Sequence, residues 1–358
     1  MKILYTITSL AVGGAETITL NLASRIRALG NLVVILSLQG DRIITVPENI
    51  QIYELHMKRS PLGVVKALLK ARKVIKSFKP DVVHANMYPA IIFSRILRIF
   101  VHIPKLISTE HTAFYKSSVP LRLEHFTDFL SDINTNVSDE ATANFISHKA
   151  FSMQKTQTVY NGIDLSKFSK NENNSLRTNY GISADTFVFI NVSRITEQKD
   201  HKNLICAFAE VKKSAPNVKL LCVGEGNLLS DLQLLINELG LENDVIFTGR
   251  KENVADYYNT SDCFVLSSAW EGFGIVLAEA MASELPVIST DCGGTREVVQ
   301  NEDFIVEARN SKLLAEKMLM VLKMSEQKRL ALGQKNRKLV QKFDINNVTA
   351  QWIKLYSE

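Results

Sequence analysis

The chain has 358 residues, of which 46% are hydrophobic, and a formal net charge of +5. This composition is typical of a globular protein with enough apolar residues for two domains of ordinary size, and it excludes a disordered or low-complexity chain. No apolar run reaches the roughly 18 residues that a membrane-spanning helix needs.

The chain begins with an alternating apolar segment that is typical of a buried strand. Charges at Lys2 and Glu16 interrupt the apolar residues, so we expect no secretory signal peptide. The four cysteines lie in the second half without a CxxC spacing, at Cys206, Cys222, Cys263 and Cys292. We expect buried, unpaired thiols and a cytoplasmic protein, because disulfides are rare in a reducing cytosol.

Residues 1–170 alternate short β-branched runs with helical patterns. The runs predict strands at about 2–8, 32–38, 81–85, 105–109 and 133–137. The patterns between them predict helices at about 14–29, 62–78, 88–100, 120–131 and 138–147. This alternation is typical of a parallel sheet with helices on both faces.

The positive charge is concentrated in this first half. Residues 1–170 have 21 basic and 12 acidic side chains, and residues 58–79 contain eight Lys or Arg and no acid. The apolar residues that fall near one side of a helix there are Val64, Val65, Leu68, Leu69, Ile75 and Phe78. The segment is either the solvated outer helix of an α/β domain or a surface for anionic lipid headgroups. Nucleic acid is a weaker third interpretation, because no aromatic residues interleave with the cations.

Residues 161–186 are polar and weakly patterned, which predicts a connector. The alternation then restarts, with strands predicted at about 187–192, 218–223, 244–248, 263–267, 286–290 and 304–306. Helical patterns separate these strands, and three more follow residue 310. Two consecutive series of this kind predict an α/β protein with two Rossmann-like domains. Because such sheets bind ligands beyond the carboxyl ends of their strands, residues just after strands are the site candidates.

Paired glycines follow two of the predicted strands. Gly13 and Gly14 precede the first helix, where they could admit an anion to the backbone amides or could serve packing alone. Gly224 and Gly226 resemble the opening of the dinucleotide fingerprint GxGxxG. Leu229 stands where the third glycine belongs, so NAD binding is disfavoured and a turn against a nucleobase remains open.

Two cations follow the first strand of the second half, in the segment SRITEQKDHKNL. Arg194 and Lys199 stand five residues apart, before a helix that we expect to begin near His201. A planar guanidinium, a compact ammonium and a helix N-terminus would together form a site for a diphosphate. The alternative is a surface loop with two solvated charges.

The segment WEGFGIVLAEA contains two carboxylates on either side of a loop and helix start. The loop and the first helical residue are expected at Gly272, Phe273, Gly274 and Ile275. Glu271 precedes the free N–H groups of that helix and could accept hydrogen bonds from sugar hydroxyls. Glu279 has apolar neighbours along the helix, so we expect a partner for its carboxylate, such as a ribose diol.

Taken together, these motifs resemble those of the retaining GT-B glycosyltransferases of family four, which include many bacterial O-antigen, capsule and lipid-glycan transferases. EGFGIVLAE is similar to the family's E-x7-E motif, and SRITEQKDHKNLI to its Arg-x4-Lys element. GGAE, STEHT with His111, NVSD, VYNGIDLSKF and DCGGTREVV match further segments in the same order along nearly the whole chain. Two departures are Ser193, where members often have glycine, and the segment NEDFIVEA, which lacks the usual glycine.

The resemblance implies two Rossmann-like domains that face each other across a cleft. Residues 1–165 would bind the acceptor and 166–342 the nucleotide-sugar, and a helix at 343–358 would cross back to the first domain. Catalytic residues would be Arg194, Lys199, Glu271 and His111. Donor-binding residues would be Gly13, Gly14, Ser193, Gly224, Arg250, Gly272, Phe273, Gly274, Ile275 and Glu279. In this assignment the two cations neutralise the leaving diphosphate, and Gly14 and His111 approach the donor and acceptor from the opposite domain.

The implied activity is metal-independent, retaining transfer of a hexose or N-acetylhexosamine from a UDP-sugar to a polyprenyl-diphosphate-linked saccharide. No cofactor or metal ion and no nucleic acid is expected, and the basic first half would rest on the inner face of the cell membrane. Two alternatives stay open at this point. One is a nucleotide-sugar 2-epimerase of similar fold, and the other is an inactive nucleotide-binding subunit.

Overall fold

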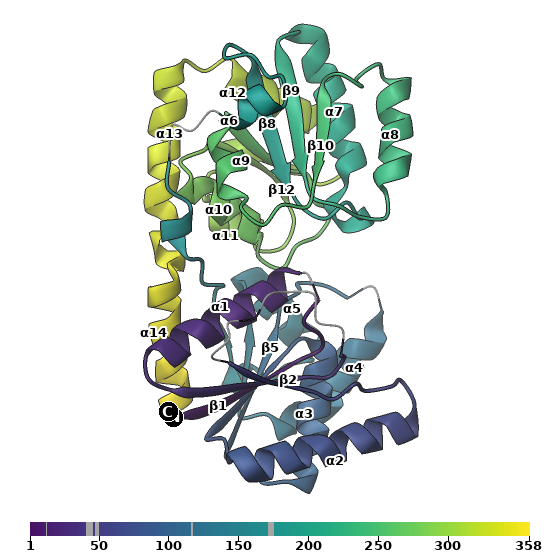
Figure 1. The fold of residues 1–358 in the computed structure, drawn as a ribbon, viewed down its shortest axis with the longest axis vertical. Coiled ribbons are helices and arrows are strands. Elements are labelled where there is room, and N and C mark those ends of the chain that lie inside the picture. Colours follow the sequence, from purple (N-terminus) through teal and green to yellow (C-terminus); the bar gives the residue numbers. More distant parts are fainter. Residues whose placement is uncertain (12, 41–45, 47–49, 116, 171–174) are drawn as a thin grey trace. The chain divides into compact units, whose positions relative to one another are not determined.

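The computed structural model describes residues 1–358 except 12, 41–45, 47–49, 116 and 171–174. The chain divides into two compact units (Figure 1). The first unit contains residues 1–162 and 345–358, and the second contains residues 163–344. Each unit has a parallel sheet of its own, as the sequence predicts.

The first unit is built on a seven-stranded sheet with the order β3-β2-β1-β4-β5-β6-β7. Its strands are β1 (Lys2–Ile7), β2 (Leu32–Ser37), β3 (Gln51–Glu54), β4 (Val82–Asn86), β5 (Lys105–Glu110), β6 (Ile133–Asn136) and β7 (Thr156–Thr158). Its helices are α1 (Gly14–Ala28), α2 (Pro61–Phe78), α3 (Tyr88–Phe100), α4 (Ser118–Thr127), α5 (Asp139–Ser147) and α14 (Ile345–Ser357), with short 3-10 turns η1 (Asp128–Leu130) and η2 (Met153–Lys155). Strand β1 lies in register with β2 from Lys2–Leu32 and with β4 from Ile3–Val82.

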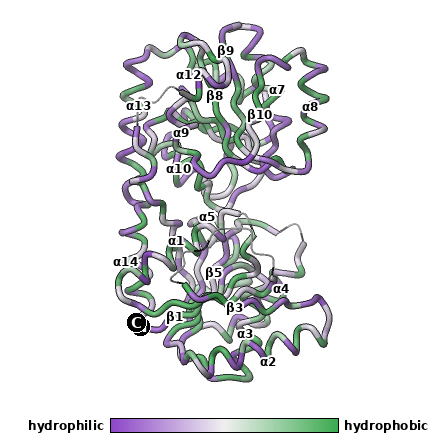
Figure 2. The backbone as a smooth tube through the Cα atoms, in the orientation of Figure 1, coloured by the Kyte–Doolittle hydropathy of each residue, from purple (hydrophilic) through white to green (hydrophobic). Residues whose placement is uncertain are grey.

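Alternating side chains of this sheet supply two cores, because successive residues of a strand point to opposite faces. Ile3 and Tyr5 face the core that α1 and α14 cover, whereas Leu4 faces the core of α2 and α3. Strand residues of both cores are apolar, as Figure 2 shows. Burial on both faces is what produces the continuous apolar strand sequences.

The last helix, α14, belongs to the first unit and packs along α1 (Figure 1). Tyr356 of this helix is buried and shares a 2.9 Å hydrogen bond with the hydroxyl of Tyr5. It also lies 2.7 Å from Nδ1 of His84, while Trp352 packs on the His84 ring at 4.4 Å between centroids. Apolar packing and these buried hydrogen bonds therefore hold α14 against the first unit.

The second unit has a six-stranded sheet with the order β10-β9-β8-β11-β12-β13. Its strands are β8 (Phe187–Val192), β9 (Val218–Val223), β10 (Val245–Gly249), β11 (Cys263–Leu266), β12 (Val287–Asp291) and β13 (Ile305–Glu307). Its helices are α6 (Ser175–Asn179), α7 (His201–Ser214), α8 (Leu229–Glu238), α9 (Ala255–Asn259), α10 (Ile275–Ala282), α11 (Thr295–Val299), α12 (Ser311–Leu322) and α13 (Glu326–Leu339). The 3-10 turns are η3 (Leu165–Lys167), η4 (Glu197–Lys199), η5 (Glu302–Phe304) and η6 (Val340–Phe343).

Two sequence-based expectations about these elements are wrong. The expected connector at 161–186 contains η3 and α6, and from residue 163 onward it belongs to the second unit. Arg177 of α6 fixes it there, through an ion pair with Asp262 at 2.8 Å and a hydrogen bond to the backbone oxygen of Thr260. The strands β3 and β7 were not predicted, because QIYE and TQT are short edge strands without an apolar alternation.

The expected apolar face of the basic helix is confirmed in part. Ile75 is buried, and Leu68 and Phe78 pack half-buried against the core, whereas Val65 and Leu69 are exposed among the cations. The other fully buried positions of α2 are Ala67, Ala71 and Val74, which the sequence pattern did not place on this face. Of the cysteines, three are buried and Cys206 is half-buried, and all four are free thiols. Among the helices described, none is both long and apolar enough to cross a bilayer.

Candidate functional site

The predicted donor-binding residues of the second unit lie near the carboxyl edge of its sheet. Loops after β8, β9 and β11 meet there through backbone hydrogen bonds. The N–H of Ile195 donates to the oxygen of Glu225 at 2.9 Å, and the N–H of Ser193 donates to Val223 at 3.0 Å. These bonds hold the loop that carries Arg194 against the turn after β9.

The close approach of these loops explains the two glycines after β9. A Cβ on Gly224 would lie 2.0 Å from the backbone oxygen of Ser193, and one on Gly226 would lie 2.1 Å from that of Ile195. Real Cβ atoms essentially never come that close to backbone, so a side chain at either position would displace the Arg194 loop. Gly224 also has a φ of +147°, a conformation that favours glycine. The glycines therefore serve loop packing, whether or not a nucleobase lies beside them.

The loop from Arg194 to Lys199 is tied to the loop after β11. The N–H of Ala269 donates to the oxygen of Gln198 at 2.8 Å, and the hydroxyl of Ser267 donates to the oxygen of Lys199 at 2.8 Å. The amide of Gln198 donates in turn to the backbone oxygen of Trp270 at 3.0 Å. These three polar contacts hold together the two loops that carry Lys199 and Glu271.

Lys199 and Glu271 form an ion pair of 2.5 Å at this junction. Their side chains are only 15% and 8% exposed, and the hydroxyl of Ser268 donates to the same carboxylate oxygen at 2.6 Å. Sequence reasoning missed Ser268, although its position three residues before Glu271 was a usable signal. The pair leaves the second carboxylate oxygen of Glu271 for further hydrogen bonds.

Arg194 is exposed, and within the described part of the chain its guanidinium has no ion pair. It is a cation held by a fixed backbone and available to an anion. Arg250 is exposed as well, just after Gly249, whose oxygen accepts the N–H of Gly224 at 3.1 Å. Among the described residues, the Arg250 guanidinium forms no ion pair with Glu271, whose carboxylate is paired with Lys199.

Helix α10 begins at this edge with an uncapped N-terminus. Gly274 precedes it with a φ of +85°, and no side chain in the described part of the chain caps the helix. The N–H groups of Ile275 and Val276 have no backbone acceptor among the described residues, so they carry the positive end of the helix dipole. Phe273 is buried and packs edge-to-face on Phe343 at 5.0 Å between ring centroids. This contact holds the loop that precedes α10 in place.

Glu279 lies one turn further along α10 and has a protein partner. The hydroxyl of Tyr258, which is fully buried, donates to its carboxylate at 2.9 Å. Burial raises the pKa of Glu279 to about 7, and the hydrogen bond from Tyr258 limits the rise. No sequence signal could identify Tyr258, because it lies 21 residues earlier on α9.

Ser193 and His201 form the floor beneath the Arg194 loop. The Ser193 hydroxyl donates to the side-chain oxygen of Asn191 at 2.6 Å and lies 3.4 Å from Nε2 of His201. Burial, together with the charge of Lys199, lowers the pKa of His201 to about 4. The imidazole is therefore neutral at physiological pH and adds no cation to the site.

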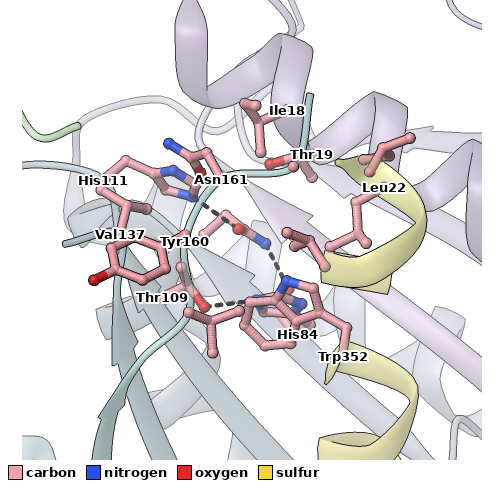
Figure 3. Close-up of a pocket in the computed structure, with 15 residues that line it drawn as sticks. Ile18, Thr19, Leu22, His84, Thr109, His111, Val137, Tyr160, Asn161 and Trp352 are labelled. Carbon is pink, nitrogen blue, oxygen red and sulfur yellow. Dashed lines mark hydrogen bonds between the residues drawn. The ribbon is translucent and has the colours of Figure 1, made fainter. Parts of the chain in front are cut away.

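The remaining predicted residues lie in the first unit. Gly14 is exposed as the first residue of α1, and Gly13 is its N-cap with the Glu16 carboxylate folded over it. His111 lies at the carboxyl end of β5 and lines a small pocket with about 10 Å³ of free volume, room for one water molecule (Figure 3). The assigned roles of Gly13, Gly14 and His111 toward a donor in the other unit stay predictions.

The hydrogen bonds of this pocket determine the tautomer of His111. Its Nε2 lies 3.0 Å from the side-chain oxygen of Asn86, and the amide nitrogen of Asn86 donates to the oxygen of His84 at 3.2 Å (Figure 3). Nε2 is therefore the protonated nitrogen, and Nδ1 is a buried acceptor without a partner in the described structure. Burial lowers the pKa of His111 to about 4, so the ring is neutral.

Comparison with known proteins identifies the family. Two family models match the chain: "Glycosyltransferase Family 4" over residues 12–167 and "Glycosyl transferases group 1" over residues 172–339. An uncharacterized glycosyltransferase of Methanocaldococcus jannaschii is 32% identical over 340 residues, covering 82% of this chain and 83% of its own. The UDP-Gal:alpha-D-GlcNAc-diphosphoundecaprenol alpha-1,3-galactosyltransferase of Escherichia coli is 27% identical over 261 residues, covering 68% of this chain and 66% of its own.

Solved structures support the same assignment at the level of the fold. The Anabaena protein Alr3699/HepE, crystallised with UDP, superposes with a TM-score of 0.87 at 23% identity, covering 100% of both chains. The lipopolysaccharide biosynthesis glycosyltransferase WaaG superposes with a TM-score of 0.77 at 18% identity, covering 99% of both. The chain therefore has the GT-B fold and belongs to the group 1 glycosyltransferases.

Proposed function

We propose that this glycosyltransferase moves a hexose or N-acetylhexosamine, with retention, from a UDP-sugar to a polyprenyl-diphosphate-linked saccharide in surface polysaccharide synthesis. The observation that carries the proposal is the cluster at the carboxyl edge of the second sheet. There Arg194, Lys199 and the uncapped start of α10 provide positive charge beside the carboxylate of Glu271. A diphosphate and a polyol are the ligand groups that such a cluster fits.

The donor diphosphate would lie between Arg194 and the first N–H groups of α10. Because Lys199 is already paired with Glu271, it would share its charge between that carboxylate and the phosphate. Preorganised cations and amides of this kind stabilise the charge that develops on a leaving phosphate. They could do so without a metal ion, so we propose metal-independent transfer.

Glu271 would hold the donor sugar by accepting its hydroxyls at the carboxylate oxygen that Lys199 does not occupy. It is a poor candidate for a covalent nucleophile, because Lys199 and Ser268 both donate to Oε1. For retention, the leaving phosphate oxygen would take the proton of the incoming hydroxyl on the same face of the sugar. Glu279 would accept the ribose diol in its ionised form.

The acceptor would contact the first unit. His111, half-buried at the carboxyl edge of its sheet, would lie beside the acceptor with its ring neutral. The Escherichia coli relative is named for a diphosphoundecaprenol acceptor, which supports a lipid-linked saccharide here. The eight cations of residues 58–79, on α2 and its flanks, support a location at the inner face of the membrane, where both headgroups and acceptor are anionic.

A donor panel tests the proposal. The full chain is incubated with UDP- and GDP-sugars and a synthetic GlcNAc- or GalNAc-diphosphate-lipid, and the product linkage is read by NMR. We expect an α-linked product from an α-linked UDP-sugar. Arg194→Ala should reduce turnover about 10²- to 10³-fold, whereas Lys202→Ala, an exposed cation on the neighbouring helix, should not.

Three outcomes would contradict the proposal. A product of inverted configuration would exclude the retaining mechanism. Interconversion of the donor without an acceptor would indicate an epimerase, and UDP binding with no turnover on any acceptor would indicate an inactive binding subunit.

A further inference from the structure

Helix α4 buries an acidic side chain and exposes large apolar ones, which is unusual for a surface helix. Its buried side carries Glu124, which forms a 2.8 Å ion pair with Arg95 of α3, and both side chains are completely buried. On the turn that follows, Asp128 lies 3.2 Å from Lys155 and accepts the amide of Asn134 at 2.6 Å. Buried ion pairs therefore hold this helix to the unit, together with Leu121, which packs against the cluster of Phe145, Ala150 and Phe151.

The outer side of the same helix carries an apolar stripe beside the exposed side chains of Arg122 and His125. Val119, Leu123 and Phe126 are exposed at a spacing of four and three residues, which places them in one stripe. Phe129 extends the stripe on the 3-10 turn η1. Phe126 is 70% exposed and Phe129 is 77% exposed. A contiguous group of exposed apolar side chains is typical of a surface that binds a membrane or another protein rather than of one that faces water alone.

Neighbouring helices continue this apolar surface. Helix α3 lies between α2 and α4, contacts both, and exposes Ile99 and Phe100 at its end. All four phenylalanines exposed in the described residues lie between positions 100 and 129. On the other side, α2 presents exposed Leu69 within its cations. The layer α2–α3–α4 therefore combines large apolar side chains with dense positive charge.

We propose that the outer face of α4 and η1 is a membrane-insertion element, with Phe126 and Phe129 entering the acyl-chain boundary of an anionic bilayer. The cations of α2 then lie over the headgroups of the same leaflet. Helices of such sheets begin at the carboxyl edge, so the stripe runs away from the edge that holds His111. The inference rests on the proposed function only in that a lipid-linked acceptor gives this anchoring a use.

Charge argues for lipid rather than a second copy of the chain. A two-fold interface brings the same patch of both copies together. The eight cations at residues 58–79, which no acid accompanies, would then face their equivalents beside the apolar stripe. An anionic bilayer is complementary to both features, because it accepts apolar side chains and neutralises the lysines.

Vesicle co-sedimentation of the full chain tests the insertion. Vesicles of phosphatidylcholine with about 30% phosphatidylglycerol supply the anionic surface. The variant Phe126→Ser/Phe129→Ser should lower the partition coefficient about tenfold or more, without changing the thermal midpoint, because both side chains are exposed. The matched control, Leu234→Ser, removes an exposed apolar side chain of α8 in the second unit and should bind like the wild type.

A second variant separates insertion from charge. Lys66→Gln/Lys70→Gln/Lys73→Gln should weaken binding at low salt and converge on the wild type at high salt, whereas the phenylalanine variant should be weak at both. Wild-type protein that ignores anionic vesicles, or a phenylalanine variant that binds normally, would overturn the inference. So would a dimer in sedimentation velocity that the phenylalanine substitutions dissociate.

Activity distinguishes this inference from the proposed function. Phe126→Ser/Phe129→Ser should transfer sugar to a short-chain, water-soluble acceptor at the wild-type rate, and should be slower only with acceptor embedded in vesicles. If no protein transfers sugar to either acceptor while vesicle binding follows the expected pattern, the proposed function fails and the insertion element stands.

Discussion

Removing Lys199 should damage the second unit as well as its chemistry. The sequence alone predicts that Lys199→Ala silences turnover and leaves the fold intact. The structure adds an ion pair with Glu271 that is only 15% and 8% exposed. Breaking a fully buried pair by removing one partner costs about 3–5 kcal/mol, because the other charge is left uncompensated.

The cost at this site should be somewhat smaller. Ser268 still donates to the Glu271 carboxylate at 2.6 Å after the lysine is removed, and the pair is not completely closed to water. We therefore expect Lys199→Ala to lower the free energy of unfolding of the second unit by about 2–3 kcal/mol. The double variant Lys199→Ala/Glu271→Ala removes both charges and should recover about 2 kcal/mol of that loss, as the coupling term of a double-mutant cycle.

Hydrogen exchange of β8 and β11 amides through a urea series measures the stability of this unit specifically. Turnover is measured on the same samples and should fall about 10²- to 10³-fold in both variants, because neither has the phosphate-binding cation. Arg194→Ala serves as the control, since its exposed side chain should affect turnover and leave stability unchanged. Additive stabilities in the cycle, or recovery of turnover together with stability in the double variant, would refute this reasoning.

Three further perturbations follow from single contacts. Affinity for UDP-glucose should fall by about tenfold in total as the pH drops well below 7, because protonated Glu279 has only its carbonyl oxygen left as a neutral acceptor for the ribose diol. Calorimetry of Glu279→Gln should show a flat pH profile if the role is correct. Burial lowers the pKa of His84 to about 3. Between pH 6.5 and pH 3 this histidine is therefore protonated in the unfolded chain and neutral in the folded chain. Acidification from pH 6.5 to 5 should lower the free energy of unfolding of the first unit by about 2 kcal/mol. Urea midpoints at the two pH values check this, and His84→Gln should lose that part of the slope. Gly226→Ala should weaken donor binding at least about tenfold, since its Cβ would lie 2.1 Å from the oxygen of Ile195; unchanged affinity would mean that the Arg194 loop needs no such support.

Local sequence patterns predicted most of the fold because they report burial directly. The strands Phe187–Val192 and Val218–Val223 have the predicted bounds, and helix α10 begins at the predicted Ile275, since each is a mainly apolar run that follows a polar turn. The edge strands β3 and β7 were missed because an edge strand is packed on fewer sides and needs less apolar sequence. The packing face of α2 was predicted only in part. Val65 and Leu69 are exposed, and two of the four fully buried positions of the helix are alanines, which carry a weak apolar signal.

The candidate site was likewise predicted only in part from the sequence. Position along the chain placed Arg194, Lys199 and Glu271 at one sheet edge, because the loops after neighbouring parallel strands lie together, and their roles stay predictions. It could not identify Tyr258 as the partner of Glu279, since that contact joins α9 to α10 through the fold. It also could not foresee that Glu124 would be buried with Arg95. Both are tertiary pairings of polar side chains, for which a single sequence carries no periodic signal.

A crystal structure of the full chain with UDP tests the central claim most directly. The account predicts the diphosphate between Arg194, Lys199 and the first N–H groups of α10, with the ribose hydroxyls at Glu279. A clear alternative exists in the second unit, where Arg177 and Arg329 line a groove of about 540 Å³ that includes the start of β8. UDP bound in that groove, with the Arg194 loop empty, would contradict the account.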